Sequence, residues 1–248
     1  MPQAFHGNSG HYPHGSRASN IESDLERFLG LLMEGDRVGC RDLLREFIAA
    51  GHDAHAAMER LAWPACDAVY KLSREDQISS VHEHAALTLL TQLVQRLECG
   101  LAKRPARCKT IIVTSGRSQA EELAAEIFAG IAEADGFDVV FLGGGVESDD
   151  LFAEAGRRRP AFVVSFASAG ADAPRLRRFI DANRRQTPVP GLRVGVGGGV
   201  FERVPGLAEE IGADLIADSP FDMLEAVRES VESQLSGRGQ GLRRPRAA

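Results

Sequence analysis

Several residue types and patterns that define whole classes of protein are scarce in this sequence. Only 4 of its 248 residues are cysteines, and they lie far apart without a CxxC or Cys/His zinc spacing. This excludes a disulfide framework and a zinc module, and it predicts reduced thiols. No apolar run approaches the roughly 20 residues that a membrane helix needs. The first residues also lack the basic and then apolar pattern of a signal peptide, so we expect a cytoplasmic protein that does not enter a membrane.

An excess of positive charge is lacking as well, since 35 acidic residues outnumber 29 Lys and Arg residues. The formal net charge is −6, which argues against a protein whose whole surface binds nucleic acid. No DNA-binding helix-turn-helix is recognisable, so direct DNA binding is not expected. With 44% hydrophobic and 26% charged residues, the composition is that of a globular protein of one large or two small domains.

The two ends of the chain differ from the part between them. Residues 1–20 are rich in Gly, His and Ser without apolar periodicity, which predicts a disordered tail. His6, His11 and His14 could bind a transition metal weakly, although a flexible tail explains them more simply. Residues 236–248 are basic and rich in Gly. They could touch nucleic acid or an acidic partner, but a solvated tail is the simpler interpretation.

From residue 21 to about residue 101 the apolar pattern is helical throughout. A first helix ends at Gly35, and Asp36 is placed to cap a second helix that stops at Gly51. A third helical stretch covers His52–Leu72 with a proline inside it, and a fourth covers Ser79–Cys99. Four helices with short connections predict an antiparallel bundle, which we expect to form a cap. Residues 102–108 then form a linker.

Residues 109–235 alternate between strand and helix patterns, which predicts a five-stranded doubly wound parallel sheet of the flavodoxin-like kind. Such sheets bind ligands beyond the carboxyl ends of their strands, where the strand order reverses. The expected strands are Thr110–Thr114, Asp138–Leu142, Ala161–Ser165, Leu192–Val196 and Asp214–Ala217. The expected helices are Ser118–Ala134, Ser148–Arg158, Ala173–Asn183, Pro205–Ile211 and Phe221–Gln234.

The loops at the strand ends carry the candidate binding groups. Glycine triplets at Gly143–Gly145 and Gly197–Gly199 indicate either tight turns or backbone that must approach a bulky ligand. Ser165 and Ser168 could offer hydroxyl groups to the same cavity. The loop at residues 115–119 leads into a helix and could hold an anion. It is neither a GxGxxG nor a Walker loop, and the acidic cluster of a receiver domain is absent.

The cap has its own candidate residues. His82 and His84 begin the longest helix, but a spacing of two places them about 200° apart, so they cannot easily bind one metal. One could face a cavity and the other water, although a lone histidine is more often structural. Trp63 and Tyr70 lie seven residues apart and share a helix face, where they could line one end of the bundle or simply pack in its core.

The cap motifs resemble a known family. Leu32–Arg37 is similar to an L-x-x-G-D turn, and Pro64, Tyr70 and Ile78–His84 are similar to a P…W…G-x-I-S-x-x-x-E-H segment, with tyrosine in place of tryptophan. These motifs belong to cobalamin (B12)-binding modules, in which a helical cap precedes a flavodoxin-like domain. Corrinoid proteins, cobalamin-dependent methionine synthases and light-sensing cobalamin regulators contain them. The resemblance covers about Ile21–Ser233, and it implies that Tyr70, Glu83 and His84 face the upper side of the corrin.

The sheet domain departs from this family at one motif. The family's D-x-H-x-x-G sequence supplies the histidine that binds cobalt from below. A gap-free register places its Asp at Gln119, its His at Glu121 and its Gly at Ala124, and a register anchored on Gly116 places the His at Gln119. Neither offers a histidine, and a carboxylate is a poor substitute because cobalt prefers imidazole.

Later motifs match the family better. Ser165 falls where the family has a serine that contacts the nucleotide tail, and Gly197–Phe201 followed by Pro205 resembles its G-G-x-x-F…P stretch. The resemblance therefore implies a cofactor site at Tyr70, Glu83, His84, Gln119, Glu121, Ser165, Ser168, Gly197, Gly198 and Gly199.

Three interpretations of this site remain open. Cobalamin could bind with its own base attached and with His84 as a candidate cobalt ligand. Haem could bind instead, with His84 as a candidate iron ligand. The site could also hold no cofactor, which would leave a ligand-free interaction scaffold.

The function that we expect is a regulatory or sensory module that acts through an unidentified partner protein. The sequence has no evident nucleophile–base pair, so we do not expect an enzyme. A methyl-carrier subunit of a corrinoid methyltransferase is an alternative, but it needs the lower histidine. Whether the chain forms a homo-oligomer is left open.

Overall fold

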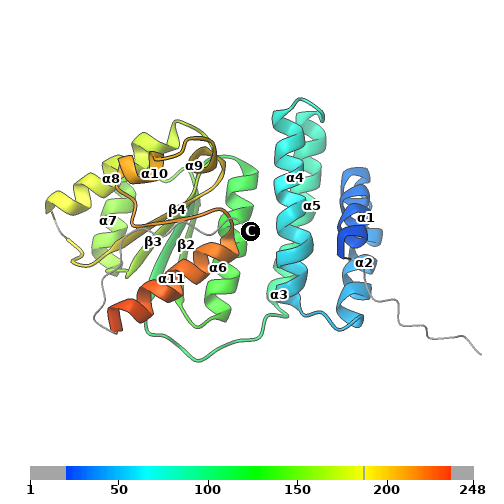
Figure 1. Ribbon diagram of the computed structural model, residues 1–248, viewed down its shortest axis with the longest axis horizontal. Helices are drawn as coiled ribbons and strands as arrows, with labels where there is room; N and C mark the ends of the chain where they lie inside the picture. The colour runs from blue at the N-terminus through cyan, green and yellow to red at the C-terminus, as the bar shows by residue number, and fades with distance from the viewer. Residues whose placement is uncertain (1–20, 187, 236–248) are drawn as a thin grey trace, which may run out of the picture.

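The computed structural model describes residues 21–186 and 188–235, which form a helical cap beside an α/β domain (Figure 1). The two tails expected from the sequence, with His6, His11 and His14, lie outside the described residues. None of the described helices is both long and apolar enough to cross a membrane. All four cysteines are free thiols.

The cap consists of helices whose ends follow the sequence signals. Asp36 caps α2 by accepting the N–H groups of Val38 and Gly39 at 3.1 and 2.9 Å, and Ser79 caps α5 by accepting the N–H of His82 at 3.3 Å. The cap elements are α1 (Ile21–Glu34), α2 (Arg37–Ala49), α3 (Ala54–Ala57), the π-helical turn η1 (Met58–Ala62), α4 (Trp63–Arg74) and α5 (Ser80–Glu98).

The segments α3, η1 and α4 follow one another without a break, so the sequence α3–η1–α4 is one helical stretch, as predicted. Pro64 occupies the first turn of α4, immediately after the wider π turn. A proline has no N–H and clashes with the carbonyl four residues before it, and an early position in a helix avoids part of this cost. Pro64 therefore lies within one continuous helical stretch, just after the point where the π turn gives way to the α-helix.

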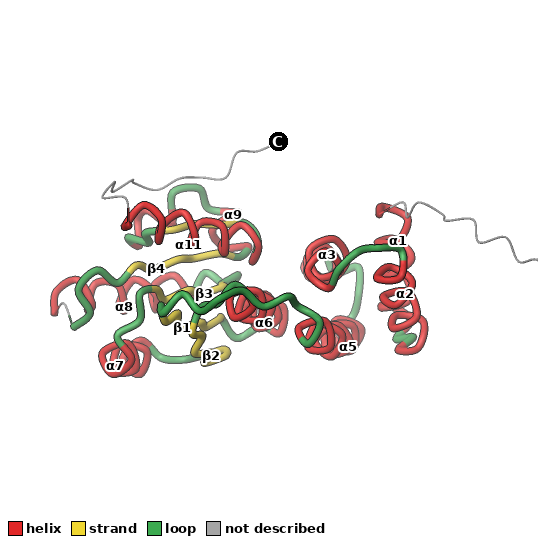
Figure 2. The backbone as a smooth tube through the Cα atoms, turned by 90° about the horizontal axis from the view of Figure 1, so that it is seen from below, coloured by secondary structure: helices red, strands yellow, loops and turns green. Residues whose placement is uncertain are grey.

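The cap and the α/β domain share one apolar core. The buried cluster runs from Phe28 and Leu61 in the cap through Leu90 on α5 to Phe128 on α6. Figure 2 shows the cap beyond α6, on the side of the domain away from α7. Alanines at the buried positions of α6, such as Ala124, allow α4 and α5 to approach it closely. The burial of apolar side chains thus holds the cap against the sheet domain.

The sheet has the predicted parallel topology, with strand order β2-β1-β3-β4-β5. All five strands lie at the predicted places, and four of them extend one or two residues further at the carboxyl end. The strand order reverses between β1 and β3, which both lie at the middle of the sheet. The strands are β1 (Thr110–Ser115), β2 (Asp138–Gly144), β3 (Phe162–Phe166), β4 (Arg193–Gly197) and β5 (Leu215–Ala217).

Helices cover both faces of the sheet. One face packs against α6 (Gln119–Ala134) and α11 (Pro220–Leu235), and the other packs against α7 (Ser148–Arg158) and α8 (Asp172–Gln186). The helix predicted at Pro205–Ile211 is present but begins two residues later, and a short helix that was not predicted precedes it. The two helices are α9 (Gly199–Arg203), which starts at the last glycine of the triplet and ends before Pro205, and α10 (Leu207–Ile211).

The connection between the two parts is anchored at a buried carboxylate. Asp135 follows α6, and its side chain is only 1% exposed. It forms ion pairs with Arg104 and Arg107 of the connecting segment at 2.9 and 2.8 Å, and with Arg228 of α11. Backbone N–H groups of Arg104 and Arg107 also donate to the carbonyls of Ala134 and Gly136. The segment between cap and sheet domain is therefore held at two ion pairs and two backbone hydrogen bonds.

The contact between α5 and α6 contains an acidic group that titrates near neutrality. Burial, and then the charges of Glu126 and Glu133, raise the pKa of Glu98 to about 7. The folded protein therefore binds more protons than the unfolded chain between about pH 4.5 and pH 7, and its stability falls as the pH rises through this window.

We expect Glu98→Gln to stabilise the protein by about 2 kcal/mol near pH 8, because it removes a charge that burial disfavours. Near pH 4.5 the variant and the wild type should differ little, since Glu98 is then mostly protonated. Urea unfolding at both pH values measures the difference. Glu229→Gln, at an exposed position on α11, is the control. An equal gain at both pH values would contradict the prediction.

Candidate functional site

Two neighbouring cavities lie where the cap meets the carboxyl ends of the strands. The first, which we call the cap cavity, has a volume of about 310 Å3 and lies between α4, α6 and the loops after β3 and β4. The face of α4 toward it presents Trp63, Cys66, Asp67, Tyr70, Lys71 and Arg74. Trp63 and Tyr70 thus line the same cavity, which was one of the two alternatives that their spacing allowed.

The second cavity, which we call the loop cavity, has a volume of about 580 Å3 and lies over the loops that follow β1, β2 and β3. This is the region of the β1/β3 reversal, where doubly wound sheets bind ligands. The two cavities share a wall of Tyr70, Arg74, Glu121 and Ser168. They are therefore two parts of one site rather than separate pockets.

Glu121 is the central residue of this shared wall, and its side chain is held by the chain itself. It is 3% exposed. Ser118 Oγ accepts the N–H of Glu121, and Glu121 Oε2 accepts the N–H of Ser118 at 2.9 Å, so the two residues form a capping box at the start of α6. Glu121 Oε1 also accepts the N–H of Ser168. The loop at residues 115–119 was predicted to be able to hold an anion. In the structure its Ser118 N–H binds the carboxylate of Glu121.

A second set of contacts joins the cap to the sheet loops. Arg203 on α9 donates to the Tyr70 hydroxyl at 3.4 Å and to the carbonyl oxygen of Ser168. The Arg74 guanidinium lies over the Tyr70 ring, 5.8 Å from its centroid. Tyr70 is therefore held from both sides at the junction of the two cavities.

Asp172, the first residue of α8, contributes a buried carboxylate to the loop cavity. It is 6% exposed, and its Oδ1 accepts a hydrogen bond from Arg175 at 2.9 Å. Burial, and then the charge of Glu121, raise the pKa of Asp172. Its Oδ2 has no hydrogen-bond partner.

Packing within the chain explains why several positions of the two glycine triplets require glycine. A Cβ on Gly144 would lie 2.4 Å from the carbonyl oxygen of Gly116, and one on Gly197 would lie 2.9 Å from that of Ala217. Gly198 has a φ of +99°, and its Cβ would lie 2.5 Å from the carbonyl oxygen of Ala167. These glycines are needed for close backbone packing, and Gly198 and Gly199 also line the cap cavity.

The structure brings some of the predicted site residues together and leaves others apart. Tyr70, Glu121, Ser168, Gly198 and Gly199 line the cavities. Gln119 does not; its amide donates to Thr88 of α5 at 3.0 Å and so helps to hold the cap. Gly197 packs against β5 as described above.

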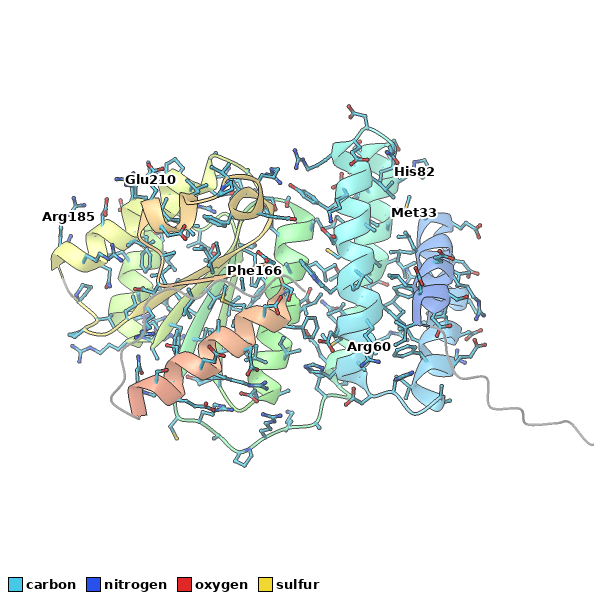
Figure 3. The ribbon with its side chains drawn as sticks, viewed as in Figure 1. Met33, Arg60, His82, Phe166, Arg185 and Glu210 are labelled. Atoms are coloured by element: carbon cyan, nitrogen blue, oxygen red, sulfur yellow. The ribbon has the colours of Figure 1, made fainter. Side chains whose placement is uncertain are left out.

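Of the three cap residues predicted to face a corrin, Glu83 and His84 lie outside the walls of both cavities. Glu83 accepts a hydrogen bond from Ser73 at 2.6 Å. His84 is exposed, as is His82, which Figure 3 shows near the α4–α5 end of the cap. Among the described residues, neither cavity has a histidine in its wall, and no group of three or more His, Cys, Asp or Glu could hold a metal ion.

Ser165 is fully buried in β3, and its hydroxyl has no hydrogen-bond partner. It lies outside the walls of both cavities, because strand alternation directs it to one face of the sheet while its neighbour Phe166 faces the other. Phe166, which Figure 3 labels, contacts Phe128 of α6 with ring centroids 5.9 Å apart and lines the cap cavity.

Sequence reasoning missed several residues of this site. Arg74, Arg117, Asp172, Arg175 and Arg203 lie on four different segments, and no motif connects them. The role of Ser118 could have been found, since Ser118 followed three residues later by Glu121 before an apolar run is a capping-box signature. Cys66 was also passed over. Burial, and then the charge of Asp67, raise the pKa of its thiol to about 12, so the thiol is protonated near neutral pH.

Three solved structures that match this chain are proteins or complexes related to corrinoids. The Methanosarcina barkeri monomethylamine corrinoid protein has a TM-score of 0.74 at 16% identity, over 84% of this chain and 99% of that one. A cobalamin-binding protein from Desulfitobacterium hafniense has a TM-score of 0.44 at 20% identity, over 84% and 98%. The methanol:cobalamin methyltransferase complex of Methanosarcina barkeri has a TM-score of 0.45 at 14% identity, over 89% and 81%. The first of these shows that the two-part fold is shared.

No curated protein matches the sequence. Two family profiles do match it, and both are described as a B12 binding domain. One covers residues 109–228, which include the whole parallel sheet, and the other covers residues 24–98, which include most of the cap. Since together they span well over half of the chain, with the cap preceding the sheet domain as the resemblance implied, this protein belongs to the family of B12-binding domains.

Proposed function

We propose that this chain is a regulatory module that binds cobalamin between its cap and its sheet domain, without a histidine ligand from the sheet side, and that it acts through a partner protein. The observation that carries the proposal is the hydrogen bonding of the Glu121 side chain. Its carboxylate accepts N–H groups from Ser118 and Ser168, so it serves the fold where the family resemblance would place a cobalt-binding histidine.

The residues of the two cavities suit the organic part of a corrinoid. Trp63, Tyr70 and Phe166 give the cap cavity an aromatic lining, against which a flat macrocycle can pack. Arginines and carboxylates line the loop cavity and can bind polar groups at the edge of the ligand. The joined volumes are of the size that ligand sites of roughly 300–1,000 Å3 have.

The same residues do not suit a protein-bound cobalt. Cobalt favours nitrogen donors of the imidazole type, and among the described residues no histidine lines either cavity. Cobalamin would therefore keep its own base. When bound, it would supply a metal centre whose oxidation state and exchangeable ligand can change, while Tyr70, Arg203 and the neighbouring loops hold and orient it.

This arrangement favours regulation over methyl transfer. Tyr70 joins the cap to Arg203 on α9, so a ligand that displaces Tyr70 would change how the cap and the sheet domain contact each other. Such a change could be transmitted to a partner protein. A methyl carrier would use a lower histidine, for which the described part of the chain offers no candidate in the cavities.

The first test is direct binding. We expect the protein to retain hydroxocobalamin through desalting, with a visible spectrum that co-elutes with the protein, and to retain haemin poorly. Methylcobalamin and adenosylcobalamin, tested in parallel, would show which form it prefers. If no chromophore co-elutes, the cofactor proposal fails and a ligand-free scaffold remains.

The second measurement concerns His84. Because this side chain is exposed and lies outside both cavity walls, we expect His84→Ala to leave the spectrum of bound cobalamin unchanged. His82→Ala, at the other exposed histidine of this helix, is the matched control. A spectral change in His84→Ala alone would make His84 the upper cobalt ligand, and would require the cap to move toward the sheet domain.

A further inference from the structure

The loop cavity contains a buried hydrogen-bond acceptor that the protein itself does not use. Asp172 Oδ1 accepts a hydrogen bond from Arg175, and Arg175 is fixed in turn by its contact with the carbonyl oxygen of Ser115 at 3.3 Å. This fixes the direction of the carboxylate. Asp172 Oδ2 has no hydrogen-bond partner in the protein. The residue is only 6% exposed, so water reaches it poorly. A buried acceptor without a donor costs free energy, so the position is suited to a donor supplied by a ligand.

The space around this oxygen is unfavourable for an anion. A Cβ on Gly116 would lie 2.1 Å from Glu121 Oε2 and 2.8 Å from Asp172 Oδ2, so both carboxylates pack against Gly116 and lie close to each other. Both oxygens of Glu121 already accept N–H groups. Asp172 Oδ2 is therefore the oxygen that remains for a ligand, and a negatively charged group next to it would be repelled.

A cation fits no better. A hard metal ion takes about six to eight oxygen ligands, and the described residues contain no group of three or more acidic or metal-binding side chains that could hold one. An organic cation would meet Arg74, Arg117, Arg175 and Arg178, which line the same cavity. The remaining ligand class is a neutral group with a hydrogen-bond donor next to an acceptor.

A primary carboxamide is such a group. Its N–H can donate to Asp172 Oδ2, while its carbonyl oxygen can accept from a guanidinium at the rim, such as Arg117. We infer that the loop cavity selects a primary carboxamide at the edge of the ligand, and that Asp172 is the residue that recognises it. The inference rests on the proposed function, because corrinoids carry several primary carboxamides around the ring. It adds that the site rejects a corrinoid in which that amide is a carboxylate.

The test compares cobalamin with its monocarboxylate derivatives, in each of which one ring amide has been hydrolysed. Hydroxocobalamin and the separated derivatives are titrated into the wild type, Asp172→Asn and Asp181→Asn, with the visible spectrum as the readout. Asp181 lies on the same helix with its side chain 46% exposed, so its variant controls for the loss of a charge from α8.

We expect the wild type and Asp181→Asn to bind at least one monocarboxylate about tenfold more weakly than cobalamin, which is the scale of one hydrogen bond to a charged group. Asp172→Asn presents an amide in place of the free oxygen. It should bind cobalamin about tenfold more weakly than the wild type, and it should discriminate less between cobalamin and that derivative.

Three results would overturn the inference. The first is that the wild type binds cobalamin and every monocarboxylate with equal affinity. This comparison needs no variant, so it does not depend on whether a variant folds. The second is wild-type affinity for cobalamin in Asp172→Asn, with an unchanged melting temperature. If the wild type retains no corrinoid at all, the proposed function fails together with the inference, and this outcome differs plainly from bound corrinoid without discrimination.

Discussion

Replacing Asp135 by alanine is expected to lower the free energy of unfolding by about 3 kcal/mol, because the change removes one partner from a buried ion cluster. The Asp135 side chain is 1% exposed and contacts Arg104, Arg107 and Arg228. Without it, three guanidinium groups face one another. They are 60%, 26% and 23% exposed, so water can solvate them in part, and this places the cost near the lower end for buried ion pairs.

Two measurements check this prediction. Urea unfolding gives the loss of stability, and trypsin cleavage after Lys103 or Arg107 reports whether the connecting segment has been released. Glu154→Gln is the control, because Glu154 also contacts two arginines, Arg157 and Arg158, whose side chains are 64% and 45% exposed. Exposed pairs contribute little, so this variant should unfold almost like the wild type. Equal, small effects of both substitutions would show that the Asp135 cluster does not hold the segment.

The pH dependence of the same cluster has a definite sign. Burial alone would raise the pKa of Asp135, but the hydrogen bond from Arg228 and the charges of Arg228, Arg107 and Arg104 outweigh it, and the pKa is lowered. The stabilisation is therefore complete above about pH 4, the usual pKa of an aspartate, and is lost as the pH falls through the lowered value. The wild type and Asp135→Ala should converge only in acid.

The strands could be predicted from the sequence because each is a short, largely apolar run with at least one β-branched residue, bounded by turn residues. Their ends were less well predicted. Phe166 and Gly197 continue β3 and β4 through a backbone pairing with each other, and a side-chain pattern does not report such pairing. The helix at Gly199–Arg203 was missed for a related reason, since a glycine triplet reads as a turn even when it starts a helix.

The candidate site was harder to predict, because its contacts join segments that the strand order brings together. The sequence placed Glu121 at the position of the family histidine, and its capping box with Ser118 was readable. The N–H that fills its second oxygen comes from Ser168, 47 residues away. That contact depends on β1 lying next to β3. Asp172 and Arg175 enter the site through the same adjacency, without any local signature.

Replacing Gly198 by alanine is the second prediction with a large effect, and we expect a loss of about 3 kcal/mol in the free energy of unfolding. Gly198 has φ +99° and ψ 167°, a conformation that is essentially restricted to glycine. A Cβ there would also lie 2.5 Å from the carbonyl oxygen and 2.9 Å from the nitrogen of Ala167. These are backbone atoms, so no side-chain rotation can relieve the contact, and β3 and β4 would have to separate at their carboxyl ends.

Urea unfolding measures the effect, and Gly170→Ala is the matched control. Gly170 lies in the loop after β3, near the same site, and a Cβ there would have no atom within 4 Å, so its substitution should change stability little. If Gly198→Ala has an equally small effect on stability, the packing of the chain does not require glycine at this position. Its place in the wall of the cap cavity would then favour the other explanation for the triplet, in which the bare backbone is there to let a bulky ligand approach.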